Sequence, residues 1–146
     1  RDGVSLVNNR KIYNEKNIKN YMVVTFDLNN LKMCNDNYGH SSGDAYIIHS
    51  AHIIETTFDR FGKCYRIGGD EFCCLIPDAA EFQIERFIQK MQQDIAILNN
   101  KNIIPTEVGI ACGYALATPD DADIEKVRER ADEMMYHNKK VLKGLI

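Results

Sequence analysis

The stretch Arg66-Ile67-Gly68-Gly69-Asp70-Glu71-Phe72 sets two glycines beside two carboxylates near the middle of the chain. Apolar residues and cysteines flank the stretch, so it predicts a tight β-hairpin whose turn carries acid. Gly68 and Gly69 can take positive φ, and without Cβ atoms they let a bulky ligand approach the backbone. Because Asp70 and Glu71 repel each other, we expect at least one to bind a divalent cation or to transfer a proton. A hairpin with solvated acids is the alternative.

A third acid follows the apolar run Tyr21-Met22-Val23-Val24-Thr25-Phe26, which predicts a strand buried on both faces. This run ends at Asp27, and a carboxylate there is costly unless positive charge meets it. Asp27 is therefore a candidate metal ligand, although it could also cap the helix expected to start near Leu31. If the strand and the hairpin share a sheet, their acids could share a magnesium ion, as in nucleotidyl-transfer sites that use two metal ions.

The remaining elements alternate between helical and strand periodicity. We expect helices at about 5–16, 44–58, 77–99 and 123–141, and a strand at 108–116. The helix from Asp44 is expected to bury Ile47, Ile48, Ala51, Ile54 and Phe58. Residues 35–44 are expected to form a loop whose Asn and Asp side chains suit recognition of a base edge, with plain solvation as the alternative.

Length and composition indicate one globular domain, since 146 residues can bury a real core. The net charge of −3 gives no general field for a nucleic acid polymer or an anionic membrane, so a polyanionic substrate needs local cations or metal. The five cysteines include no CxxC pair, which favours buried thiols in a reducing cytoplasm. No apolar run is of membrane-spanning length. Because the chain opens with Arg1, we expect a domain excised from a longer protein, in which an upstream sensory or membrane-anchoring module precedes it.

Taken together, these motifs resemble the GGDEF family of diguanylate cyclases. Residues 66–72 match the family signature, and 26–32 and 35–44 are similar to its first metal strand and its nucleotide-binding loop. Residues 130–136 and the following Lys139 resemble its closing helix, and 2–10 resemble its entry segment more loosely. The resemblance spans nearly the whole chain.

The resemblance implies an α/β (α+β) fold of the palm-like nucleotidyl-cyclase type, with a central, mostly antiparallel sheet flanked by helices. It implies a single GGDEF domain over 1–146 that condenses two GTP into cyclic di-GMP and releases two pyrophosphates. Turnover would require a homodimer and two Mg²⁺ or Mn²⁺ ions per active site. The alternative is a catalytically weak module that binds GTP and regulates a partner domain; neither activity would need membrane contact by this domain.

The resemblance also implies roles for individual residues. The metal ligands would be Asp27, the Leu28 carbonyl, Asp70 and Glu71, with Asp70 and Glu71 also catalytic and Glu71 helping to deprotonate the attacking 3′-hydroxyl. The substrate-binding set would be Lys32, Asn35, Asp44, Arg66, Gly68, Gly69, Lys139 and Lys143. In this set Asn35 and Asp44 would read guanine and the lysines would hold phosphates, while the glycines would let the nucleotide approach the hairpin.

Three departures from the family pattern have consequences. Asn29 stands where many members have a second aspartate, although other members carry the same Asn-Asn pair. Lys143 replaces a frequent arginine and gives up bidentate phosphate binding. Asp59 and Gly62 occupy the positions of the RxxD product-inhibition site, so feedback inhibition of the usual kind is not expected.

Overall fold

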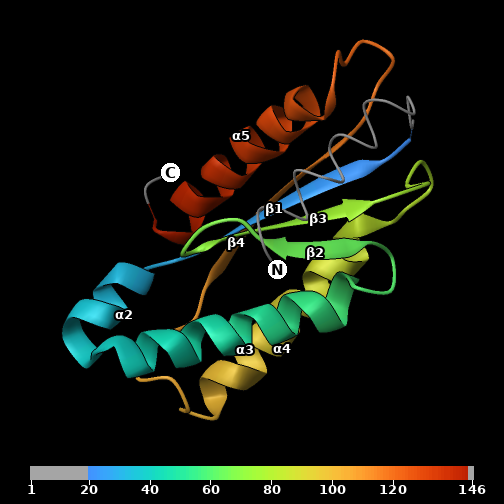
Figure 1. Cartoon of the computed structure of the whole chain (residues 1–146). Coiled ribbons are helices and arrows are strands. Elements are labelled where there is room, and N and C mark those ends of the chain that lie inside the picture. The colour runs from blue at the N-terminus through green and yellow to red at the C-terminus, as the bar shows by residue number, and fades with distance from the viewer. Residues whose placement is uncertain (1–19, 145–146) are drawn as a thin grey trace.

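The structure is a computed structural model that describes residues 20–144, so the helix expected at 5–16 lies outside the described part. Figure 1 shows the arrangement of the elements. In chain order they are β1 (Met22–Leu28), α2 (Leu31–Tyr38), α3 (His40–Phe58), β2 (Lys63–Arg66), β3 (Glu71–Ile76), α4 (Ile84–Asn100), β4 (Ile110–Leu116) and α5 (Ile124–Leu142).

The four strands form one sheet in the order β2-β3-β1-β4, and every neighbouring pair is antiparallel. β1 lies in the interior of the sheet, and all of its residues are buried, as the apolar run predicted. Its register with β3 sets Met22 opposite Ile76 and Asp27 opposite Glu71. The expected antiparallel sheet flanked by helices is confirmed, and this register brings the acid of the strand beside the hairpin.

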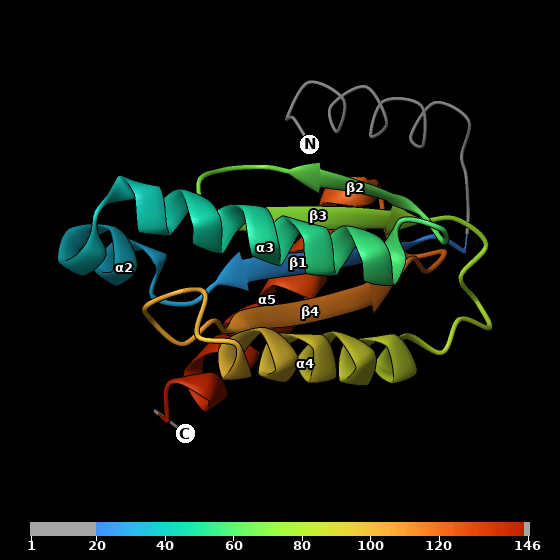
Figure 2. The same ribbon diagram turned by 90° about the horizontal axis from the view of Figure 1, so that it is seen from below.

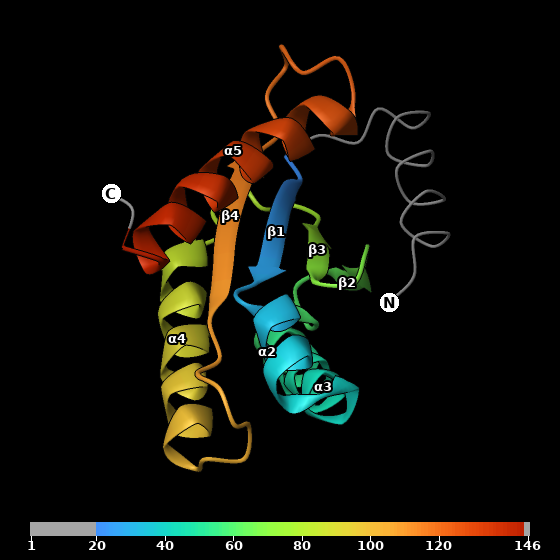
Figure 3. The same cartoon turned by 90° about the vertical axis from the view of Figure 1, so that its left-hand side faces the viewer.

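Helices cover both faces of the sheet (Figures 2 and 3). α3 and α4 pack on one face, where the larger core cluster includes Val24, Phe26 and Met91. α5 packs on the other face over a smaller cluster that includes Val23 and Val127. Successive side chains of β1 therefore enter different layers, which explains why its sequence is apolar throughout rather than alternating.

The loop expected at 35–44 is wrong. α2 runs to Tyr38 and α3 starts at His40, so the reversal is made at Gly39 alone, which has a φ of 89°. A positive φ of this size is readily available to glycine, which explains how one residue can separate two helices. Most polar residues on either side are exposed helical positions, and Asn35 and Ser42 are half-buried ones, so their polarity did not signal the absence of a helix.

The buried face of α3 also differs from the expected one. Ile48 is 66% exposed, whereas Tyr46, Ile53, Ile54 and Phe58 are buried. The buried stripe also contains Gly43, Ser50 and Thr57. Counting only apolar side chains missed these small residues, which let the helix lie close to its neighbours.

The helix expected to begin at 77–79 begins instead at Ile84. Asp78 has a left-handed φ of 49°, and the Ala79 N–H donates to the Asn20 carbonyl, so this segment is tied to the chain before β1. The last strand also begins slightly late, at Ile110. The expected cap of α5 is confirmed, because Asp123 Oδ1 accepts a hydrogen bond from the Lys126 N–H.

All five cysteines are buried thiols, as expected. Cys64 and Cys74 face each other across β2 and β3, with their Sγ atoms 3.5 Å apart. Within residues 20–144, no helix is both long enough and apolar enough to cross a membrane.

The contact between α5 and β4 generates a stability prediction. A Cβ atom on Gly113 would lie 2.2 Å from the Ala131 carbonyl oxygen and 2.3 Å from the Met135 nitrogen, both backbone atoms of α5. Gly113→Ala should therefore lower the free energy of unfolding by roughly 1–3 kcal/mol, measured by urea denaturation. The control is Gly68→Ala, where a Cβ would meet no atom within 4 Å. Equal losses in the two variants would contradict this packing.

Candidate active site

Three carboxylates converge where β1 ends. Asp27 is the register partner of Glu71, and the Leu28 N–H donates to the Asp70 carbonyl over 2.8 Å. Asp27, Asp70 and Glu71 each offer an oxygen within 4.8 Å of the others. The predicted convergence of the strand acid and the hairpin acids is therefore observed.

The turn between β2 and β3 is braced by Arg66. Its Nε donates to the Gly68 carbonyl at 3.1 Å, and its Nη2 donates to the Gly69 carbonyl at 2.9 Å. Gly68 and Gly69 do not use the positive φ that glycine allows, because Gly39 and Gly144 are the glycines of residues 20–144 with positive φ. The space over Gly68 and Gly69 is open, since a Cβ at either would meet no atom within 4 Å. These glycines leave the outer side of the turn accessible.

α5 brings a cation to the acids. Lys139 Nζ lies 2.9 Å from Asp27 Oδ2, although the two residues are 112 positions apart in the chain. Asp27 is 3% exposed, and its other oxygen, Oδ1, is buried with no hydrogen-bond partner among the described residues. One oxygen of a buried carboxylate is thus left to bind another group.

The shifts in pKa follow from burial and, to a smaller extent, from the crowding of like charges. Burial raises the pKa of Asp27, and the charge of Asp70 adds to the rise, while Lys139 opposes it. Burial also raises the pKa of Glu71, with further contributions from Asp27 and Asp70. Burial alone would lower the pKa of Lys139, but its hydrogen bond to Asp27 and the surrounding negative charge raise it. Lys139 thus interacts with Asp27 and Asp70, while Arg128 opposes the rise in the pKa of Glu71.

These residues fit a divalent cation. Hard cations such as Mg²⁺ prefer carboxylate and carbonyl oxygens. The cluster supplies three carboxylates, one of which has an enclosed and unpartnered oxygen. A bound cation would relieve the mutual repulsion that raises the pKa values of Asp27 and Glu71.

A cavity of about 410 Å³ lies beside the acids. It is lined by Leu28, Asn30, Leu31, Lys32, Met33, Asp36, Asn37, Asp70, Lys139 and Lys143. Five of these residues belong to the predicted site: Leu28, Asp70 and the three lysines. The sequence analysis missed Asn30, Leu31 and Met33 as site residues, and no local signal marked them. Asp36 forms an ion pair with Lys32 over 2.9 Å. It belongs to the polar stretch at 35–44, which was expected to suit recognition of a base edge.

Asn35 and Asp44 do not line this cavity but lie together where α2 meets α3. The Asn35 side chain fills the space next to Gly43, where a Cβ would come within 1.6 Å of Asn35 Oδ1. Asp44 follows Gly43 in α3 and is exposed. Asp36 and Asn37, which neighbour Asn35 in α2, do line the cavity.

Known proteins resemble this chain in sequence and in fold. A family model described as "Diguanylate cyclase, GGDEF domain" matches residues 5–143. The chain is 31% identical over 123 residues to the diguanylate cyclase DgcN of Escherichia coli, covering 83% of this chain and 30% of that protein. It is 29% identical over 134 residues to the signaling protein YkoW of Bacillus subtilis, covering 86% of this chain and 16% of that protein. The chain thus spans less than a third of either relative.

Solved structures share the fold. The GGDEF domain of DgcB from Caulobacter crescentus, determined in complex with c-di-GMP, has a TM-score of 0.80 at 20% identity, covering 95% of this chain and 85% of that chain. The FimX GGDEF domain from Pseudomonas aeruginosa also has a TM-score of 0.80, at 14% identity, covering 95% of this chain and 88% of that chain. At these identities the similarity supports the fold alone, which is the palm-like fold expected from the sequence.

Because the folded state raises the pKa of Glu71, we expect Glu71→Gln to be more stable than the parent chain, by an amount that depends on pH. A carboxyl whose pKa is raised in the folded state costs stability as pH rises above its ordinary value, here 4.5. In the presence of a chelator, Glu71→Gln should therefore unfold at higher urea than the parent chain at about pH 7, and the difference should shrink toward about pH 4.

The matched control is Glu133→Gln, which changes an exposed carboxylate of α5 outside the cluster. This control should leave the urea midpoint unchanged at both pH values. A Glu71→Gln chain less stable than the parent chain near neutral pH would show that ionised Glu71 stabilises the fold, contrary to the crowding argument.

Proposed function

The family model covers residues 5–143 of the chain, so the chain belongs to the GGDEF diguanylate cyclase family, and we propose that it condenses two GTP into cyclic di-GMP. The proposal depends mainly on one observation: the three carboxylates of Asp27, Asp70 and Glu71 adjoin a cavity lined by three lysines. Acids of this kind suit metal ions, and lysines suit phosphates. Phosphoryl transfer requires mainly this positioning and neutralisation of charge.

The metal ligands would be Asp27, Asp70, Glu71 and the Leu28 carbonyl, holding two Mg²⁺ or Mn²⁺ ions. When bound, these ions would neutralise the triphosphate and stabilise the attacking and leaving oxygens. Lys32 and Lys143, both exposed at the cavity, would bind phosphate oxygens. Lys139 would keep Asp27 ionised and oriented through their 2.9 Å hydrogen bond.

Glu71 would assist in removing the proton from the attacking 3′-hydroxyl. Its pKa is raised by burial and by the neighbouring acids, which makes its carboxylate a better proton acceptor than a solvated glutamate. Arg66 would support substrate binding by donating hydrogen bonds to the Gly68 and Gly69 carbonyls, which hold the turn in place. The open space over these glycines would admit the nucleotide.

Guanine would be read at the corner between α2 and α3. Asp44 can accept two N–H donors, which matches the N1–H and exocyclic amine of guanine, and Asn35 offers both a donor and an acceptor. Because adenine presents an acceptor at N1, the carboxylate of Asp44 would disfavour ATP.

The condensation needs two half-sites that each bind one GTP and face each other. A homodimer with two-fold symmetry provides this arrangement.

The full-length protein would carry an upstream sensory module and act in the cytoplasm. Among the structural neighbours, SiaD from Pseudomonas aeruginosa was determined with its activator SiaC; that structure has a TM-score of 0.78 at 21% identity, covering 96% of this chain and 55% of that chain. The present chain would likewise be regulated by a bound activator protein.

Turnover is tested by the double substitution Asp70→Ala and Glu71→Ala. The chain, fused to a dimerising coiled coil, is incubated with Mg²⁺ and GTP, and products are separated by chromatography. We expect the double variant to lose at least about a hundredfold in rate, because it loses two groups that stabilise charge in the transition state.

The control replaces Asp120 and Glu133, two exposed acids outside the cluster, by alanine. Unchanged cyclic di-GMP formation by the Asp70/Glu71 variant would reject the assignment, and GTP bound but not converted by the parent chain would favour the regulatory module.

Nucleotide choice is tested by Asp44→Asn. Removing the charge and one acceptor should lower kcat/KM for GTP by about 10- to 100-fold, because hydrogen bonds to charged groups contribute roughly 1.5–3 kcal/mol. The substitution should affect ATP much less, so the preference for GTP over ATP should narrow. Asp120→Asn serves as a control for the loss of one exposed carboxylate. An unchanged preference would place guanine recognition elsewhere.

A further inference from the structure

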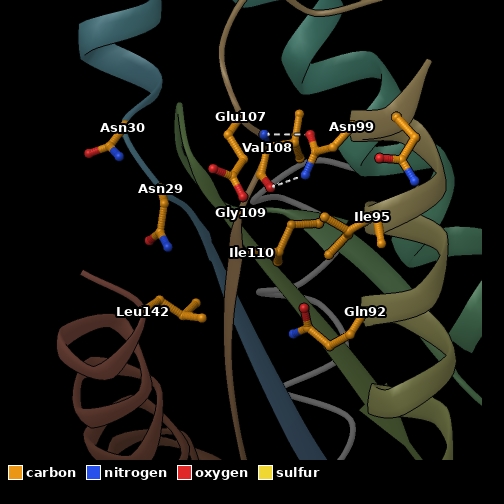
Figure 4. A pocket seen from close by; sticks show the side chains of 12 residues that line it. Asn29, Asn30, Gln92, Ile95, Asn99, Glu107, Val108, Gly109, Ile110 and Leu142 are labelled. Atoms are coloured by element: carbon orange, nitrogen blue, oxygen red, sulfur yellow. Dashed lines mark hydrogen bonds between the residues drawn. The ribbon is translucent and has the colours of Figure 1, made fainter. Parts of the chain in front are cut away.

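A second cavity, of about 430 Å³, lies between α4, the chain leading into β4 and the end of α5. Figure 4 shows Gln92 and Ile95 on one side of it, Asn29 and Leu142 on the other, and Gly109 and Ile110 between them. The full lining is Asn29, Asn30, Gln92, Ile95, Ala96, Asn99, Asn100, Glu107, Val108, Gly109, Ile110 and Leu142. The proposed catalytic mechanism does not use this cavity.

The cavity lies where β1 and β4 separate. Their ladder continues to the pair Leu28 and Ile110, and the Asn29 N–H still donates to the Gly109 carbonyl over 2.8 Å. The reciprocal bond is replaced by a side chain from α3. The Gly109 N–H donates to the Tyr46 hydroxyl at 3.0 Å, and that hydroxyl lies 2.6 Å from the Asn29 carbonyl, to which it donates. Tyr46 therefore acts as a wedge between the strands.

This wedge is rigid. Tyr46 is fully buried, and burial raises its pKa to about 12, so at neutral pH its hydroxyl keeps the proton that it donates. On the opposite side, Asn99 holds Val108 with two hydrogen bonds, one from its Nδ2 to the carbonyl and one to its Oδ1 from the N–H. The backbone of the cavity at Asn29, Val108 and Gly109 is thus held in place before any ligand arrives, which lowers the entropic cost of binding.

The lining residues disfavour ligands that carry phosphate and favour uncharged ligands with hydrogen-bond donors and acceptors. It contains one charged residue, Glu107, and neither lysine nor arginine, in contrast to the lysine-lined cavity beside the acids. A phosphate group would meet a carboxylate with no cation to offset it. The polar groups are mostly side-chain amides, each of which presents a donor beside an acceptor. Asn29 is 6% exposed, and its Oδ1 has no partner among residues 20–144.

We propose that this cavity binds an uncharged heterocycle of nucleoside size, with N–H donors next to acceptors on its edge. The amides of Asn29, Gln92 and Asn100 would pair with that edge. Aliphatic side chains of Ile95, Ile110 and Leu142 would contact its apolar faces. A volume of about 430 Å³ lies within the range of small-molecule sites. The ligand would be distinct from GTP, since the site provides nothing to bind a triphosphate.

Binding is tested by titrating the ¹⁵N-labelled chain separately with guanosine, adenosine, cytidine and uridine. We expect at least one nucleoside to shift the backbone amide resonances of Asn29, Val108 and Gly109 in a saturable manner. The matching 5′-monophosphate should bind at least about tenfold more weakly, because its phosphate meets Glu107 without a cation. This readout requires no turnover, so it stays informative if the proposed cyclase activity fails.

Two substitutions on α4 have matched controls. Ala96→Phe would fill the cavity and Gln92→Leu would remove one amide, and each should weaken nucleoside binding at least about tenfold. Gln93 is exposed next to Gln92 but does not line the cavity, so Gln93→Phe and Gln93→Leu should bind like the parent chain.

Three outcomes would overturn the proposal. In the first, none of the four nucleosides shifts the amides of the cavity wall. In the second, well-folded Ala96→Phe and Gln92→Leu chains bind as the Gln93 variants do. In the third, the 5′-monophosphate binds more tightly than its nucleoside, which would indicate a phosphate site.

Discussion

The antiparallel register of β1 with β3 is the constraint on which the rest of the molecule depends. Because side chains alternate along a strand, a slip of one residue would turn every side chain of β1 to the opposite face. The register that buries Val24 and Phe26 beneath α3 and α4 is also the one that sets Asp27 opposite Glu71. Core packing therefore enforces the position of an acid that contributes nothing to the core.

The position of these acids is unfavourable for stability taken alone. A buried carboxylate next to two others raises the free energy of the folded state, and the Lys139 hydrogen bond offsets only part of this effect. The two core clusters on either side of the sheet supply the compensating apolar burial. The site is thus preorganised for cations by a scaffold that would be more stable without it, a common relation between activity and stability.

Much of the fold could be predicted from local signals, whereas the missed features depend on distant contacts. The strand before Asp27 and the cap at Asp123 could be predicted because the local sequence of each carries the pattern. The break between α2 and α3 was predicted to be too long, because one glycine suffices to make it. Tyr46 could not be found from sequence, because its hydroxyl meets residues 17 and 63 positions away. Arg66 was assigned to substrate by resemblance, and in the structure its guanidinium holds the carbonyls of its own turn.

Asn30 has a left-handed φ of 59° and lines both cavities. Asn30 is thus part of the wall of each space, in a conformation that asparagine tolerates better than most residues with a Cβ. A ligand in one space that displaced Asn30 would change the affinity of the other space, and thermodynamic reciprocity would make the coupling factor equal in both directions. Among residues 20–144, any such coupling would pass through this shared wall and would need no movement of the sheet.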